Sequence, residues 1–255
     1  MSHTRKLPYK ARLKRSMLEK SFVKLGDLIP DFLKSYVKLL YHRRIAAMAP
    51  IRPAGVPRWL YGLEITRTVE APRSSTGRGL YADAFHYYPS GFRSLPYIRA
   101  VLHADDVFVD LGSGLGEVVL YIAGTCRIRK AVGIELDPEL VRIARKSLHK
   151  MQSEGRILTP VELIEGDVVD ADLSEGTTYF LFNPFGEATL HKVLANIRLS
   201  LGTNPRRVRI LYLNPKFASC IDENDWLKAT DHHPRWIPDS LYSKTLFRIW
   251  SSLNL

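Results

Sequence analysis

Residues 107–117 read VFVDLGSGLGE, and this stretch decides the fold. A run of apolar, branched and aromatic residues predicts a buried strand over 107–111. The glycines that follow predict a tight turn in which a ligand can approach the backbone closely; they are Gly112, Gly114 and Gly116. A helical pattern begins at the last of them and continues over 116–124. The segment is therefore predicted to be a strand, a glycine turn and a helix.

The acids around this turn limit the kind of ligand that it can bind. A dinucleotide-binding fingerprint would place its third glycine at position 117, where this sequence has Glu117. Asp110 supplies a second carboxylate just before the turn. Two negative charges repel a pyrophosphate and attract a cation. The turn therefore favours a positively charged ligand and disfavours a nicotinamide-dependent oxidoreductase.

Short apolar runs alternate with helical stretches from residue 105 onward. The runs predict strands over 107–111, 131–135, 161–164, 179–182 and 208–213. The stretches between them predict helices over 116–124, 138–150 and 187–201, and a further helical face covers 92–102. This alternation predicts an α/β fold, a three-layer, doubly wound, mostly parallel sheet. A final strand is expected over 245–250, as an antiparallel edge.

Charge is distributed unevenly along the 255 residues. Residues 1–50 contain twelve Lys and Arg and three acids, a surplus of nine out of the total net charge of +11. We expect residues 1–55 to form a basic, largely helical N-terminal extension, with helices near 16–25 and 30–48, and residues 56–255 to form the ligand-binding domain. The basic segment either packs on the domain with a solvated charged face or contacts nucleic acid or an acidic partner. An organellar transit peptide is a further alternative for its first residues.

Composition excludes several classes of protein. A sequence that is 45% hydrophobic and 25% charged is typical of a globular protein and not of a disordered chain. No apolar run approaches the ~18 residues that a membrane span needs. Cys126 and Cys220 stand alone without CxxC or Cys/His spacing, so no metal ligands are predicted and a reducing compartment is expected. The predicted localisation is cytoplasmic.

The run DLGSGLG over 110–116 resembles the first motif of class I S-adenosylmethionine-dependent methyltransferases. This resemblance implies a class I methyltransferase-like fold with S-adenosyl-L-methionine as cofactor. The next two predicted strands end at Glu135 and near Asp167, where the family places acids that bind the ribose hydroxyls and the adenine amino group. The resemblance covers about residues 85–215. The cofactor-binding residues that it implies are Asp110, Gly112, Ser113, Gly114, Gly116, Glu135, Leu136, Asp167, Val168 and Asn183.

The segment Asn183-Pro184-Phe185 partly resembles the NPP-aromatic motif of amino-methylating DNA and protein methyltransferases, with a phenylalanine in place of the second proline. Together with residues 110–119 it is also similar to non-SET histone lysine methyltransferases. Both resemblances imply a nitrogen acceptor, with Asn183 and Phe185 as catalytic residues. The Asn183 oxygen and the Pro184 carbonyl could accept hydrogen bonds from an amine, and Phe185 could form an apolar wall. The alternative is a simple turn that ends the strand.

Tyr88, in the sequence YYPSGF over 87–92, is the third candidate catalytic residue, because a loop at this place in similar enzymes closes over the cofactor. A tyrosine packed in the core is the alternative. The predicted function is methyl transfer to an amino nitrogen, in a protein lysine or a nucleic-acid base, and a small amine also remains open. The alternative function is a cofactor-binding adaptor that contacts nucleic acid or protein through its basic arm.

Overall fold

A computed structural model of the chain describes residues 95–230 and 247–253. The expected N-terminal extension, the boundary between residues 55 and 56, and Tyr88 lie outside the described residues. Within the described part, seven strands form one sheet: β1 (Val107–Leu111), β2 (Lys130–Glu135), β3 (Val161–Glu165), β4 (Thr178–Leu181), β5 (Arg209–Leu213), β6 (Leu227–Thr230) and β7 (Phe247–Ser252). Their order across the sheet is β3-β2-β1-β4-β5-β7-β6.

The first five strands are parallel, and β7 pairs antiparallel with β5 on one side and β6 on the other. From β1 the chain steps outward through β2 to β3, and it then returns to β4 on the other side of β1. The direction of the strand order therefore reverses between β1 and β4. In open α/β sheets, ligands bind beyond the carboxyl ends of the strands at such a reversal. The fold thus places the candidate site at the ends of β1 and β4.

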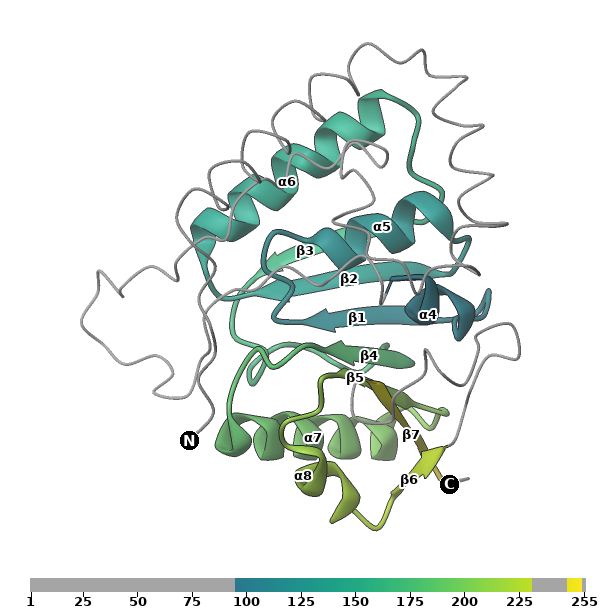
Figure 1. Ribbon diagram of the computed structural model, residues 1–255, viewed down its shortest axis with the longest axis vertical. Coiled ribbons are helices and arrows are strands. Elements are labelled where there is room, and N and C mark those ends of the chain that lie inside the picture. The colour runs from purple at the N-terminus through teal and green to yellow at the C-terminus, as the bar shows by residue number, and fades with distance from the viewer. Residues whose placement is uncertain (1–94, 231–246, 254–255) are drawn as a thin grey trace, which may run out of the picture. The chain divides into compact units, whose positions relative to one another are not determined.

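Five helices accompany the sheet in the described residues: α4 (Leu95–Ala100), α5 (Glu117–Thr125), α6 (Pro138–Ser153), α7 (Glu187–Thr203) and α8 (Ala218–Asp222). Figure 1 shows α5 and α6 on one side of the sheet and α7 and α8 on the other. This follows from right-handed crossovers that run in opposite directions from the centre of the sheet. The described part has the three layers that the alternating pattern predicts.

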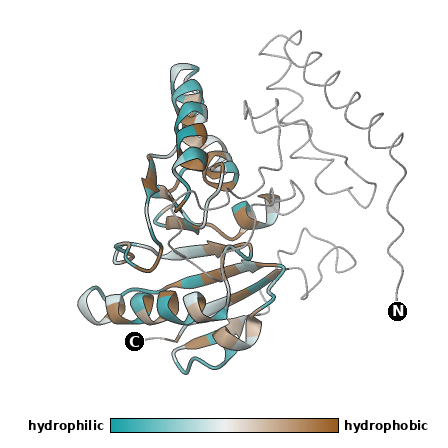
Figure 2. Cartoon of the chain, turned by 90° about the vertical axis from the view of Figure 1, so that its left-hand side faces the viewer, coloured by the Kyte–Doolittle hydropathy of each residue, from teal (hydrophilic) through white to brown (hydrophobic). Residues whose placement is uncertain are grey.

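Local sequence explains why the elements begin and pack where they do. Helix α6 has Pro138 at its first position, and the Asp137 side chain caps it by accepting hydrogen bonds from the backbone N–H groups of Glu139 (2.8 Å) and Leu140 (3.4 Å). Strand β1 is buried along its whole length, as expected for a central parallel strand. Hydrophobic residues accordingly dominate the strands in Figure 2, whereas the helices alternate between hydrophobic and hydrophilic residues.

The amino ends of the strands, opposite the candidate site, are held by a buried ion pair. The Arg209 guanidinium donates to the carboxylate of Asp106 and to the backbone carbonyl of Val101. Asp106 also accepts hydrogen bonds from the hydroxyl groups of Thr177 (2.8 Å) and Thr178 (3.1 Å). This network joins the amino ends of β1, β4 and β5, and it leaves the carboxyl ends of those strands available for chemistry.

Most predicted elements are confirmed to within a few residues, and one detail is wrong. The last strand is antiparallel as predicted, but it is second from the edge, because β6 pairs outside it. Strand β6 has four residues, of which two are exposed, and so it lacks the apolar run that identified the other strands. Among the described residues, no helix is long and apolar enough to cross a membrane.

Candidate functional site

The glycine turn after β1 has the backbone conformation that its sequence predicts. The φ angles of Gly112, Gly114 and Gly116 are +77°, +55° and +71°, all in the left-handed region that favours glycine. The N–H groups of Gly112 and Ser113 both donate to the carbonyl of Ile134 at 2.9 Å. The turn is therefore fastened to the end of the neighbouring strand β2.

Glu135, at the end of β2, is fixed by the same turn. One carboxylate oxygen accepts a hydrogen bond from the Gly114 N–H at 2.8 Å, and the other accepts one from the Asp137 N–H at 2.9 Å. Burial raises the pKa of Glu135, while the two backbone hydrogen bonds lower it in part. These bonds hold the carboxylate in one orientation, and each oxygen keeps further lone pairs that can accept hydrogen bonds from a diol.

Asp110 and Glu117 add two more buried carboxyl groups to this end of the sheet. Their exposed fractions are only 3% and 2%. Burial raises the pKa of Asp110 well above its ordinary value, and the neighbouring charges of Glu135 and Glu117 raise it further. Three acids thus interact electrostatically beside a glycine turn. A cation bound there relieves their repulsion, so the site fits a cationic ligand better than an anionic one.

The end of β3 contributes the residues expected near an adenine ring. The Gly166 N–H donates to the Glu135 carbonyl at 3.0 Å, which brings the loop that carries Asp167 alongside the end of β2. One oxygen of Asp167 accepts a hydrogen bond from the Val169 N–H at 2.7 Å, which orients its side chain. Val168 is buried, and Leu136 is 37% exposed. The predicted cofactor-binding residues after β2 and β3 therefore lie on neighbouring strand ends.

The loop after β4 packs directly on the glycine turn. A Cβ atom added at Gly112 would lie 2.3 Å from the Cβ of Pro184, so the two backbones approach as closely as they do only because residue 112 is glycine. Asn183, just before this proline, has a φ of +49°. The glycine turn and the loop of Asn183, which lie far apart in the sequence, are thus in contact, and Asn183 lies beside the turn at the reversal of the strand order.

The side chain of Asn183 is held by two partners from β5 and the loop after it. The Tyr212 hydroxyl donates to Asn183 Oδ1 at 2.7 Å, and Asn183 Nδ2 donates to the Asn214 carbonyl at 2.8 Å. Burial raises the pKa of Tyr212 to about 12, so its hydroxyl stays protonated as a donor. Because a carbonyl oxygen has two lone pairs, Oδ1 can accept one more hydrogen bond.

The other predicted site residues are Ser113, Phe185 and Tyr88, and the structure describes the first two. The Ser113 side chain is buried under the turn, close enough to Gly133 that a Cβ added there would lie 2.8 Å from its Oγ. Phe185 is 6% exposed and belongs to the hydrophobic core, where its ring presents little surface to an acceptor. Tyr88 lies outside the described residues.

Sequence reasoning did not select Tyr212 or Asn214, although one signal for the second was present. The dipeptide Asn-Pro occurs at the end of β4 and again at 214–215, after β5. Both asparagines have positive φ angles, +49° for Asn183 and +52° for Asn214. A repeated Asn-Pro after adjacent strands therefore marks two loops of similar geometry that meet. Tyr212 gave no signal, because its place in a buried strand is that of an ordinary core residue.

The described residues form an α/β fold with a glycine turn and buried acids at the ends of its parallel strands, and comparison with known proteins identifies the class of protein. Residues 93–185 match the family described as "Histone methylation protein DOT1". The chain is 29% identical over 119 residues to a protein-lysine N-methyltransferase of Saccharolobus islandicus, a match that covers 46% of this chain and 71% of that protein. The matched family segment contains the glycine turn, the three acids and Asn183.

Solved structures with a similar arrangement include an RNA methyltransferase from Salinibacter ruber in complex with S-adenosyl-L-homocysteine, with a TM-score of 0.43 and 23% identity over 66% of this chain and 94% of that one. A precorrin-8w decarboxylase from Methanobacterium thermoautotrophicum is similar with a TM-score of 0.45 and 22% identity, covering 66% of this chain and 92% of that one. The chain is a class I S-adenosylmethionine-dependent methyltransferase.

Proposed function

We propose that this methyltransferase transfers the methyl group to the amino nitrogen of a lysine side chain in a protein. The observation that carries this proposal is the fixed oxygen of Asn183, which lies beside the glycine turn with a lone pair available for an N–H donor. The proposal has two parts: how the chain holds the cofactor, and how it orients the acceptor.

The three acids suit the cofactor because its methionine ammonium and its sulfonium are both positive. We assign Asp110 and Glu117 to the positively charged end of the cofactor and Glu135 to the two ribose hydroxyls. Asp167, Val168 and Leu136 would surround the adenine. S-adenosylmethionine supplies an electrophilic methyl group whose leaving group is already activated by its charge. The protein therefore needs to supply alignment more than acid–base catalysis, and alignment alone can contribute ~7–11 kcal/mol.

The acceptor must arrive as a neutral amine, because an ammonium has no lone pair. An unperturbed lysine has a pKa of about 10.4, so roughly 1 in 2,500 is neutral at pH 7, which corresponds to a cost of roughly 5 kcal/mol. A site that removes water from the amine reduces this cost, since desolvation disfavours the charged form. Asn183 Oδ1 and the Pro184 carbonyl can each accept an N–H, which turns the nitrogen lone pair toward the methyl group.

Support for a lysine acceptor comes from the matching family and from the relative in Saccharolobus islandicus. The matching family is described by histone methylation, and the relative from Saccharolobus islandicus is a protein-lysine methyltransferase. Lysine methylation requires an acceptor site that receives a flexible amine without reading a base. The short polar edge formed by Asn183 and Pro184 meets that requirement.

The test is transfer of a radiolabelled methyl group from S-adenosylmethionine into a cell extract by the full chain. We expect the label to be removed by protease and not by nuclease, and to be recovered as methyllysine after acid hydrolysis. Asn183→Ala should reduce turnover far more than cofactor affinity. Asn204→Ala serves as a control, because Asn204 caps the far end of α7. Nuclease-sensitive label, or full activity of Asn183→Ala, would overturn the proposal.

A further inference from the structure

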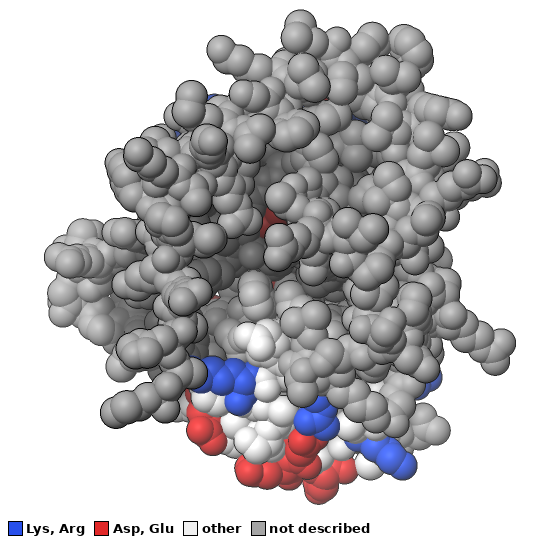
Figure 3. All heavy atoms as spheres, viewed as in Figure 1, with Lys and Arg blue, Asp and Glu red and all other residues white. Residues whose placement is uncertain are grey.

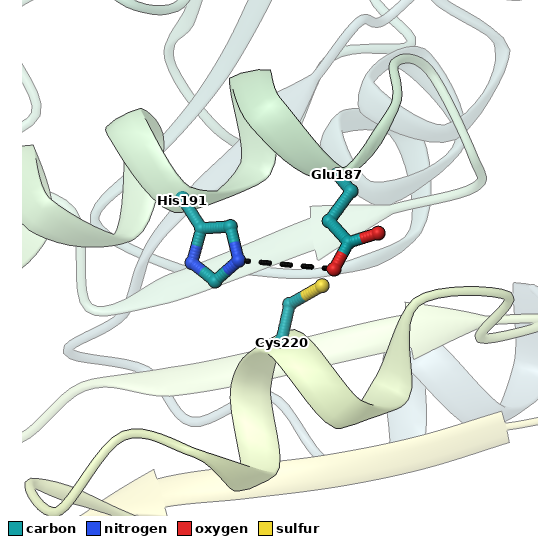
Figure 4. A group of neighbouring side chains, drawn as sticks. All are labelled: Glu187, His191 and Cys220. Carbon is teal, nitrogen blue, oxygen red and sulfur yellow. Dashed lines mark ion pairs between the residues drawn. The ribbon is translucent and has the colours of Figure 1, made fainter.

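Three side chains of different chemistry converge between α7 and α8, outside the site described above. Glu187 is the first residue of α7, His191 lies one helical turn further along the same face, and Cys220 extends from α8 (Figure 4). Their ligand atoms all lie within 4.8 Å of one another, and Glu187 Oε1 is 4.0 Å from His191 Nε2. A carboxylate, an imidazole and a thiol therefore face a common point.

This arrangement matches the dimensions of a zinc site. Zinc bonds of ~2.0–2.3 Å in tetrahedral geometry place neighbouring ligand atoms roughly 3.3–3.8 Å apart. The observed separations, none above 4.8 Å, need to contract by at most about 1.0–1.5 Å to reach these values. Glu187 and His191 can make that adjustment, because their side chains are 63% and 49% exposed. Cys220 is buried and supplies the fixed point of the group.

The kinds of ligand also select the metal. A thiolate and an imidazole favour zinc and similar transition metals over magnesium and calcium, which prefer sites made wholly of oxygen. Two ligands at positions i and i+4 of one helix, with a third from a neighbouring helix, hold three corners of a tetrahedron. Water would occupy the fourth corner.

A simpler explanation treats the group as a set of pairwise contacts. A glutamate in the first turn of a helix is stabilised by the helix dipole, and it can pair with a protonated histidine four residues later. The Cys220 thiol, from another helix, also forms a hydrogen bond with the Glu187 carboxylate, and burial together with this contact raises the pKa of the thiol. These contacts join the side chains in pairs, whereas a divalent cation would bind all three at once. Figure 3 shows both acidic and basic side chains on the described part of the surface that faces the viewer.

We propose that Glu187, His191 and Cys220 bind a zinc-type divalent cation. The Cys220 thiol gives up its proton to solvent as it coordinates the metal. Methyl transfer does not require this metal. Helix α7 begins just after the loop of Asn183, and α8 begins just after the loop of Asn214. The bound cation would join the two helices directly behind these loops.

The test uses the full chain, reduced and freed of metal with a chelator, then titrated with Co²⁺ and, in a separate experiment, with Zn²⁺. We expect cobalt to give the strong visible bands of a tetrahedral site and a thiolate-to-cobalt charge-transfer band, and zinc to displace it. The variants are Cys220→Ser and His191→Gln. The controls are Cys126→Ser, at the other buried cysteine, and His149→Gln, at an exposed histidine on α6.

Loss of a hydrogen-bond partner of a metal ligand can weaken metal binding by ~100-fold. Loss of one of the ligands themselves should weaken zinc binding by at least as much. We expect this loss in both variants and in neither control, and we expect zinc to raise the melting temperature of the controls but not of His191→Gln. Because His191 is exposed, His191→Gln should fold even if Cys220→Ser does not. Absence of a thiolate–cobalt band, or equal zinc affinity in His191→Gln and His149→Gln, would overturn the proposal.

Discussion

The contact between Gly112 and Pro184 can be tested by comparing two Gly→Ala substitutions that differ in one respect. Gly112 and Gly155 both have positive φ angles, +77° and +63°. An alanine at either position carries the backbone cost of the left-handed region, roughly 1–2 kcal/mol. At Gly155 the new Cβ would meet nothing within 4 Å, whereas at Gly112 it would lie 2.3 Å from the Pro184 Cβ. The difference between the two variants therefore isolates the steric conflict.

Overpacking of this kind costs about 1–3 kcal/mol. Since 1 kcal/mol shifts the melting temperature of a domain of this size by roughly 2–4 °C, Gly112→Ala should melt roughly 2–12 °C below Gly155→Ala. Thermal unfolding followed by circular dichroism measures this difference. Methyl transfer should also fall in Gly112→Ala alone, because relief of the conflict displaces the loop of Asn183. Equal melting temperatures together with equal activities would refute the proposed contact.

Three further predictions concern the buried acid Asp110, the hydrogen bond between Tyr212 and Asn183, and the methyl acceptor. Asp110→Asn should raise the melting temperature of the cofactor-free protein and weaken S-adenosylmethionine binding. Because the pKa of Asp110 is raised in the folded state, the wild-type protein should lose stability as the pH rises above about 4. The variant should lose less stability over the same pH range, and thermal melts at several pH values measure this difference. Tyr212→Phe removes the hydrogen bond to Asn183 Oδ1, worth ~0.5–1.5 kcal/mol, together with the one that the hydroxyl accepts from the Phe217 backbone. Loss of the Asn183 bond should lower kcat by about 2- to 12-fold with unchanged cofactor affinity, and an unaltered kcat would argue against positioning by Tyr212. The rate with a lysine peptide at limiting concentration should rise about tenfold per pH unit between pH 7 and 9, as the neutral amine increases; a flat profile would contradict attack by a neutral lysine.

Much of the fold could be predicted from the sequence because its central strands are buried and parallel. Such strands are continuous apolar runs, and β1 was predicted with the bounds that the structure gives. The antiparallel end of the sheet was harder to predict. The register of β7 between β5 and β6 depends on pairings between segments that are distant in the sequence, and β6 shows two exposed residues out of four.

The site shows the same division between local and non-local information. The acids and glycines could be identified from the sequence because they lie at or just after the ends of strands, and parallel strands bring these ends together. Tyr212 could not be found in this way, since its role comes from a hydrogen bond to a loop 29 residues away. The cluster of Glu187, His191 and Cys220 could not be predicted from the sequence either, because the spacing of Cys220 from the other two is not that of a metal-binding motif. Such contacts require the packing of helices, which periodicity does not specify.

The central claim is that the acids beside the glycine turn bind S-adenosylmethionine, and calorimetric titration of Glu135→Gln tests it most directly. Glu165→Gln is the control, because Glu165 ends the adjacent strand β3 with a side chain that is 49% exposed. A hydrogen bond to a charged group contributes about 1.5–3 kcal/mol, so S-adenosylmethionine should bind Glu135→Gln roughly 10- to 150-fold more weakly than the wild type. Glu165→Gln should bind it as the wild type does. Equal affinity for all three proteins would contradict the assignment of the site.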